Sequence, residues 1–418
     1  MLIYNANNSG HYRRNNILCV LLAYEAPADS MIVRLSTAFS SDDVLEIHIL
    51  FHELITHAFR NNYASGNIWQ NYLTHFILSN ENFFSLACER RTPPQGSLRD
   101  IAIHDFEVFM RLFALDNEHL HYIDSFSEDS PQDSPVCEIS KAIAETRSAR
   151  KIFDIVTNWY KNHGVGYFAT RKAFRYDNGK FTPLANDDVG NVRLSDLVGY
   201  DAQKSELRAN TEAFISGRPA NNVLLYGDGG TGKSTSVKAL LNEYFSGGLR
   251  VIEIYKHQFR DIQAITQKLR TRNYKFILFI DDLSFEENES DYKYLKAIIE
   301  GGIETRPDNI LIYATSNRRH IVREVWKDRD DMEHNGDIHR SDTVEEKLSL
   351  ASRFGIAINF SSPVRDSYHE IVRTLAEKSG LNVPDDELIS GADRWEIRHG
   401  GMTGRAARQY VDYLLGRQ

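Results

Sequence analysis

The chain has 418 residues, 42% of them hydrophobic and 26% charged, with a formal net charge of −9. This length gives room for two or three domains, and the composition is typical of a soluble globular protein. The acidic balance argues against a globally basic nucleic-acid binder, so we expect nucleic acid not to be the main partner. The three cysteines form no C-x-x-C pair, which excludes a cysteine zinc site and suits a reducing cytosol.

Near the N-terminus, Arg13 and Arg14 precede an apolar run at residues 17–23, a weak imitation of a secretion signal. The run is short, and Glu25 interrupts the region where cleavage would occur. We interpret it as a strand or short helix of the mature fold. No apolar stretch is long enough to cross a bilayer, so the expected location is cytoplasmic, without a membrane partner.

Residues 1–163 are predicted to form a mainly helical domain. Apolar residues recur at helical spacing over 44–59 and 105–115, and a series over 139–159 predicts one long helix that ends near Gly164. No motif in this half carries chemistry that can be assigned.

His52 and His57 invite a zinc-protease interpretation, because a glutamate lies beside the first of them on a predicted helix. That motif needs histidines four residues apart, so that both face one side. Here the histidines are five residues apart. At about 100° per residue, the second side chain points about 140° away from the first around the helix. We therefore interpret both as ordinary helix residues.

Residues 164–191 are predicted to join two domains. Asn178 and Gly179 lie between short apolar runs, a pattern that predicts a β-hairpin. The polar residues 186–191 then predict a boundary loop.

From residue 192 the pattern alternates between strands and helices, which predicts an α/β domain with a parallel sheet over 192–362. In such folds the ligand lies beyond the carboxyl ends of the strands. Helical spacing returns over 363–418, which predicts a small helical domain. The strand candidates are 223–226, 251–255, 276–281, 310–315 and 356–360, and the later helices are 364–379, about 385–398 and 403–415.

Residues 227–234 fit G-x-x-x-x-G-K-[ST], the phosphate-binding P-loop, between an apolar run and a helical run. Glycines let the backbone approach the phosphates, and the loop N–H groups and the helix N-terminus face the anion. Lys233 is expected to reach the β- and γ-phosphates, and Ser234 to ligate Mg²⁺. The predicted ATP-binding residues here are Gly227, Asp228, Gly229, Gly230, Thr231, Gly232, Lys233, Ser234 and Thr235.

The strand candidate over 276–281 ends in two carboxylates, Asp281 and Asp282. An acid at the tip of a buried strand is what a magnesium site beside a P-loop requires. We expect Asp281 to bind the metal together with Ser234, and Asp282 to polarise the attacking water.

Two further residues are candidates for catalysis. Asn317 follows the next strand, where its amide can orient water or touch the γ-phosphate. Arg353 precedes the strand after that, and an arginine supplied by a neighbouring subunit can stabilise the transition state of phosphoryl transfer. By spacing alone, Arg353 is an ordinary surface residue.

These motifs occur in the order found in AAA+ ATPases, which the chain resembles. Over about 192–418 it is most similar to a bacterial family of AAA+ ATP-binding proteins catalogued as a domain of unknown function. Besides the P-loop, the stretches that carry the resemblance are 197–200, 281–286, 314–320, 345–350, 352–355 and 404–405.

The resemblance implies ATP and Mg²⁺ as cofactors and a homo-oligomeric ring, commonly a hexamer, when nucleotide is bound. It implies no particular protein client. It also implies roles for single residues: Val198 and Gly199 beside the adenine, Asn317 as sensor 1, Arg353 as an arginine finger acting on a neighbour, and Arg405 as sensor 2 on the helical lid, with Arg408 as the alternative.

One residue departs from the family pattern: most AAA+ proteins carry Asp-Glu where this chain carries Asp281-Asp282. Aspartate is shorter by one methylene, about 1.5 Å of reach, so turnover is expected to be weak. Glu286 is an alternative base. Two alternative functions remain open, an ATP-dependent assembly scaffold with little turnover and a DNA-linked AAA+ ATPase. The acidic segment 327–346 is interpreted as a solvated loop that could contact a neighbouring subunit or a client.

Overall fold

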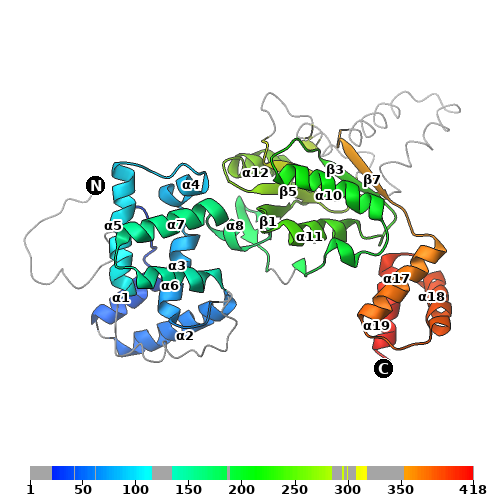
Figure 1. Cartoon of the computed structure of the whole chain (residues 1–418), viewed down its shortest axis with the longest axis horizontal. Coiled ribbons are helices and arrows are strands. Elements are labelled where there is room, and N and C mark those ends of the chain that lie inside the picture. Colours follow the sequence, from blue (N-terminus) through cyan, green and yellow to red (C-terminus); the bar gives the residue numbers. More distant parts are fainter. Residues whose placement is uncertain are drawn as a thin grey trace, which may run out of the picture. The chain divides into compact units, whose positions relative to one another are not determined.

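The computed structural model of the protein describes residues 21–41, 43–61, 63–114, 134–185, 189–284, 294–295, 299, 307–317 and 353–417. The chain divides into two compact units, Met1–Thr170 and Arg171–Gln418 (Figure 1). The acidic segment 327–346 and Glu286 lie outside the described residues.

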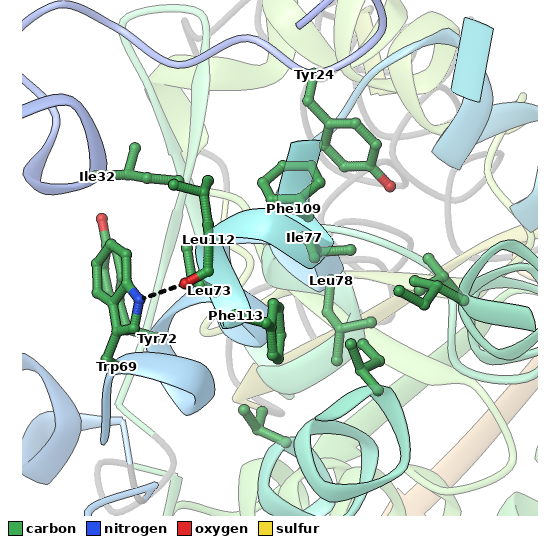
Figure 2. Close-up of a cluster of buried hydrophobic side chains, with 14 of the residues drawn as sticks. Tyr24, Ile32, Trp69, Tyr72, Leu73, Ile77, Leu78, Phe109, Leu112 and Phe113 are labelled. Carbon is green, nitrogen blue, oxygen red and sulfur yellow. Dashed lines mark hydrogen bonds between the residues drawn. The ribbon is translucent and has the colours of Figure 1, made fainter. Parts of the chain in front are cut away.

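The described part of the first unit is helical, as predicted. Its aromatic and aliphatic side chains share one core, in which Trp69 donates its indole N–H to the carbonyl of Leu112 at 3.0 Å (Figure 2). Its helices are α1 (Met31–Ser41), α2 (Val44–Arg60), α3 (Ile68–Ser79), α4 (Phe83–Glu89), α5 (Ser97–Phe113), α6 (Pro135–Glu145), α7 (Ala149–His163) and α8 (Tyr167–Thr170).

One expectation for this unit is wrong, and a second is not met over the part of it that is described. The single long helix over 139–159 is two helices, α6 and α7, because Thr146 and Ser148 adopt extended backbone and end one helix before the next begins. The apolar run at 17–23 was expected to be a strand or helix, but its described part, 21–23, is neither. The buried carboxylate of Asp105 instead accepts the N–H groups of Leu22, Ala23 and Tyr24 at 2.8–3.1 Å and holds this segment to the core.

The second unit contains the predicted parallel sheet. Among the described residues, seven strands form one sheet in the order β2-β1-β4-β5-β6-β3-β7. The five strands predicted from apolar runs are confirmed, as β3 (Val223–Gly227), β4 (Leu249–Glu253), β5 (Lys275–Ile280), β6 (Ile310–Asn317) and β7 (Ile356–Phe360). Helices α10 (Asp201–Ile215) and α11 (Lys233–Tyr244) bury apolar residues against the sheet.

The predicted hairpin is present and extends this sheet. Asn178 and Gly179 form the turn, both with positive φ, between β1 (Ala173–Asp177) and β2 (Lys180–Pro183). β1 also pairs in parallel with β4, from Ala173 opposite Val251 to Arg175 opposite Glu253. The hairpin is therefore part of the α/β layer.

Three helices follow the sheet, as predicted: α17 (Arg365–Lys378), α18 (Asp385–His399) and α19 (Gly404–Leu415). They enclose a small core of their own around Tyr368, Val372, Ala407 and Val411. The partly buried Val198 packs against the same core, so the segment before α10 is joined to these helices. We call α17–α19 the lid.

Candidate functional site

A cleft of about 630 Å³ lies at the carboxyl ends of β3, β5 and β6. In parallel sheets these ends share one edge, and β3 lies between β6 and β7, where the order of the strands reverses. The cleft is lined by Val192, Asp196, Leu197, Val198 and Tyr200, by residues 229–235, by Asp281, Asp282, Thr315 and Asn317, and by Ile371, Leu375, Gly404, Arg405 and Arg408 of the lid.

Strand register explains why residues far apart in sequence meet here. Gly227, where β3 ends, lies opposite Asn317, where β6 ends. Ile280 lies opposite Ala314, so the chain beyond β5 continues beside Thr315 and Ser316. The sheet thereby brings together the P-loop, the two aspartates and the predicted sensor 1.

Three P-loop glycines are required by close packing. A Cβ at Gly227 would lie 2.2 Å from the carbonyl oxygen of Phe360, and one at Gly232 would lie 2.5 Å from Leu197. A Cβ at Gly230 would lie 2.9 Å from the Cβ of Arg405. All three residues also have positive φ. The loop therefore fits against β7, the segment before α10 and the lid at once.

Lys233 is the first residue of α11 and is buried, with 7% of its surface exposed. Its ammonium donates to the carbonyls of Gly227 and Asp228 at 2.9 and 2.6 Å, and lies 3.4 Å from the amide oxygen of Asn317. Burial lowers the pKa of Lys233, and the carboxylates of Asp228, Asp282 and Asp281 act in the opposite direction. Phosphate groups bound in the loop would add negative charge beside this buried ammonium and so stabilise it.

Ser234 and Asp281 are adjacent, as a magnesium site requires. The Ser234 hydroxyl donates to Oδ1 of Asp281 at 2.6 Å. One hydroxyl and one carboxylate, with nucleotide phosphates and water completing the shell, form the kind of oxygen donor set that Mg²⁺ takes in nucleotide sites. The residues present therefore fit the metal.

Asp282 has a backbone of the left-handed type, with φ of 53°. Its carboxylate accepts a hydrogen bond from the Asn317 amide at 2.9 Å, and its N–H donates to the Thr315 hydroxyl at 2.9 Å. The predicted base and the predicted sensor 1 are therefore in direct contact.

Part of the cleft lining is aliphatic. Val192, Leu197 and Val198 approach from the segment before α10, and Ile371 and Leu375 come from the lid helix α17. Lys204 donates to the carbonyl of Leu197 at 2.8 Å and fixes that segment. Such a surface suits a flat, apolar base. The aliphatic residues other than Val198 were not predicted as site residues.

The lid contacts the P-loop directly. The N–H of Arg405 donates to the carbonyl of Gly230 at 3.1 Å, and the Thr403 hydroxyl caps α19 by accepting from Ala406. Arg405 and Arg408 both line the cleft. Lys378 of the lid also forms an ion pair with Asp196 at 3.0 Å.

Four predicted site residues are not among the described residues that line the cleft: Gly199, Gly227, Asp228 and Arg353. Gly227 and Asp228 are joined to β7 instead, since Asp228 donates its N–H to Phe360 and accepts the N–H of Ser362 at 2.7 Å. Arg353 precedes the amino end of β7, and Phe360 lies at its other end, beside Gly227. The four residue steps from Ile356 to Phe360 alone span about 13 Å, so Arg353 lies far from the P-loop of its own chain.

The histidines with the zinc-protease-like spacing lie in the first unit. His57 contacts the hydroxyl of Tyr63, whereas His52 is exposed. Over the described ranges, no group of three or more His, Cys, Asp or Glu side chains is placed to hold a metal ion. Over the same ranges, no helix has the length and apolar character needed to span a membrane.

Comparison with known proteins supports the interpretation of the second unit. A family described as "Protein of unknown function (DUF815)" matches residues 169–418. The chain is 25% identical over 291 residues to the ATP-dependent zinc metalloprotease FtsH 2 of Salinibacter ruber (strain M8), a match that covers 60% of this chain and 40% of the relative. It is 33% identical over 88 residues to the replication factor C large subunit of Staphylothermus marinus, covering 21% of this chain and 20% of the relative.

Among solved structures, the chain is similar to the Thermotoga maritima RuvB Holliday junction branch migration motor. The TM-score is 0.35 and the identity 18%, and the match covers 53% of this chain and 63% of the other. The chain thus spans less than two thirds of each of these proteins.

Proposed function

The chain belongs to the DUF815 family, whose match covers more than half of it, and we propose that its second unit binds and hydrolyses Mg-ATP. The observation that carries this proposal is that Lys233, Ser234, Asp281, Asp282 and Arg405 line one and the same cleft. The AAA+ character of the chain and the family match agree with it.

In this proposal the triphosphate and the base of ATP bind to different parts of the cleft. The triphosphate lies over the P-loop, where the N-terminus of α11 and the Lys233 ammonium meet its charge. The base lies against Leu197, Val198, Ile371 and Leu375. Ser234 and Asp281 would hold Mg²⁺, which when bound neutralises charge on the phosphate oxygens.

Hydrolysis requires a group that orients water beside the γ-phosphate. Asp282 and Asn317 are in contact at the strand ends and line the cleft, so we assign this role to the pair. Arg405 would contact the γ-phosphate from the lid. Arg353 would act on the ATP of a neighbouring subunit, within a homo-oligomeric ring.

The contact between Gly230 and Arg405 could couple ATP hydrolysis to movement of the lid. A change at the γ-phosphate would alter this contact and shift the lid against the α/β layer. We assign residues 192–362 to the AAA+ domain, 363–418 to the lid and 1–163 to the helical N-terminal domain. Residues 164–191 lead from one to the other, and the hairpin within them extends the sheet of the AAA+ domain. We expect the protein to act in the cytoplasm on a client that the site does not identify.

Turnover separates an ATPase from the alternative of a nucleotide-dependent scaffold. Purified protein at high concentration should release phosphate from ATP only when Mg²⁺ is present, and Lys233→Ala should abolish this release. ATP binding and assembly without phosphate release above the Lys233→Ala level would favour the scaffold.

The match to a replication factor C large subunit favours one further candidate, a DNA-linked ATPase. The net charge of −9 weighs against it. DNA binding that requires ATP and weakens steeply with salt would support this candidate, since phosphate contacts release counterions.

A further inference from the structure

Thr315 makes two hydrogen bonds that no other role in the site explains. The residue lies on β6, two positions before Asn317, and only 2% of its surface is exposed. Its hydroxyl donates to Oδ1 of Asp281 at 2.5 Å and accepts the N–H of Asp282 at 2.9 Å. One hydroxyl thus uses its donor and an acceptor position on two adjacent aspartates.

The bond to Asp281 fixes the orientation of a carboxylate. Oδ1 of Asp281 accepts both the Thr315 hydroxyl and the Ser234 hydroxyl, the latter at 2.6 Å. Hydrogen bonds to an ionised acceptor are short and strong. Two of them on one oxygen restrain the rotation of the Asp281 carboxylate beside Ser234, the other proposed metal ligand.

The bond to Asp282 fixes a strained backbone. An aspartate with φ of 53° is in a region that residues other than glycine seldom adopt, and it must be held by its surroundings. The Thr315 hydroxyl accepts the N–H of Asp282, and the Thr315 carbonyl accepts the N–H of Leu283 at 2.7 Å. This reversal of the chain brings the Asp282 carboxylate to the amide of Asn317.

We propose that Thr315 is a positioning residue of the Mg-ATP site. Its hydroxyl orients the metal-binding carboxylate of Asp281 and holds Asp282 in the conformation that meets Asn317. The proposal rests on the proposed function, because it presumes that Mg²⁺ and ATP bind in this cleft. It goes further by assigning a specific task to a side chain that need not touch either ligand.

The test compares Thr315→Val, which keeps the shape of the side chain but removes the hydroxyl, with Thr315→Ser, which keeps the hydroxyl. ATP affinity is measured by titration calorimetry in EDTA and again in saturating MgCl₂, and the ratio of the two dissociation constants is compared between proteins. Thr211→Val is the matched control, because its buried hydroxyl donates to the Leu207 carbonyl at 2.8 Å and bonds the Tyr313 hydroxyl at 2.9 Å, and neither partner is one of the two aspartates.

In Thr315→Val, the factor by which Mg²⁺ strengthens ATP binding should be about tenfold smaller than in wild type. This is the order expected for loss of a hydrogen bond to a charged group. Thr315→Ser should stay within about twofold of wild type, and Thr211→Val should lower the melting temperature without changing the ratio. If Thr315→Val does not fold, Thr315→Ala against Thr315→Ser isolates the same hydroxyl.

A wild-type ratio in Thr315→Val, or an equal loss in Thr315→Ser, would overturn the positioning role alone. Wild-type protein that binds no ATP in either buffer would overturn the proposed function, and the role of Thr315 with it. Binding without turnover leaves the comparison intact, because the readout does not depend on hydrolysis.

Discussion

At the scale of single residues, Asp282 is the one to which the proposed hydrolysis assigns the most. Its carboxylate is one methylene shorter than glutamate, yet its left-handed backbone brings it to 2.9 Å from the Asn317 amide. Asparagine tolerates this backbone as well as aspartate does. Asp282→Asn therefore removes the charge without disturbing the turn.

We predict that Asp282→Asn binds Mg-ATP as wild type does and loses at least about a hundredfold in kcat, the contribution expected of a positioned base. Single-turnover hydrolysis measures this directly. Glu286→Gln serves as the comparison, because Glu286 is the alternative base. A loss confined to Glu286→Gln would assign the base to that residue.

The site residues that could be predicted from the sequence are those that belong to a short local motif. Lys233, Ser234, Asp281 and Asn317 were predicted from the P-loop and from polar residues at strand ends, and all four line the cleft. Ile371 and Leu375 could not be predicted, because any amphipathic helix carries such residues and only tertiary packing selects the pair that faces the base side. Gly227 was predicted for phosphate approach, whereas the structure gives it contact with Phe360.

At the scale of elements, the P-loop and α19 are in close contact at Gly230. Gly230 has φ of 76°, and a Cβ there would lie 2.9 Å from the Cβ of Arg405 and 3.2 Å from the hydroxyl of Thr403. Gly217 has nearly the same φ, 72°, but a Cβ there would meet nothing within 4 Å. Comparing alanine substitutions at the two glycines therefore distinguishes the effect of backbone strain from the effect of contact with the lid.

Gly230→Ala should weaken ATP binding ten- to a hundredfold, since overpacking costs about 1–3 kcal/mol and displaces α19. Gly217→Ala should lower stability by about 1–2 kcal/mol, the cost of a left-handed alanine, and leave ATP affinity unchanged. Titration calorimetry and thermal unfolding of both variants give the comparison. Equal ATP affinity in the two would show that the lid contact does not matter for binding.

Elements with a clear pattern were predicted well. The strands of the α/β layer begin and end within about two residues of the predicted limits, because buried parallel strands read as continuous apolar runs. The pairing of β1 with β4 could not be predicted, since nothing in a hairpin's own sequence identifies a strand more than seventy residues away. The break between α6 and α7 was missed because apolar spacing continues across it.

At the scale of the whole molecule, Arg353 raises the question of assembly. It lies at the amino end of β7, while the P-loop lies at the carboxyl end of the adjacent strand β3. An arginine in this position can serve an ATP site only when that site belongs to another chain. If Arg353 is the arginine finger that we propose, the ATP site is shared between subunits.

Arg353→Ala should bind ATP normally and lose about a thousandfold in hydrolysis, the order of magnitude known for arginine fingers. Mixing it with Lys233→Ala protein should recover part of the activity, because one variant supplies the nucleotide site and the other supplies the arginine. Mixing with the double variant Lys233→Ala, Arg353→Ala is the control and should recover none. Activity in the first mixture no higher than in the control would argue against a shared site.

The central claim is that the cleft between the P-loop and the lid binds ATP, and a calorimetric titration with ATP in the presence of Mg²⁺ tests it most directly. We predict saturable binding of one ATP per chain in the wild type, and affinity at least about a hundredfold weaker in Lys233→Ala, as expected when a charge-assisted contact to phosphate is lost. Equal affinity in the two proteins, or no binding by the wild type, would contradict the account.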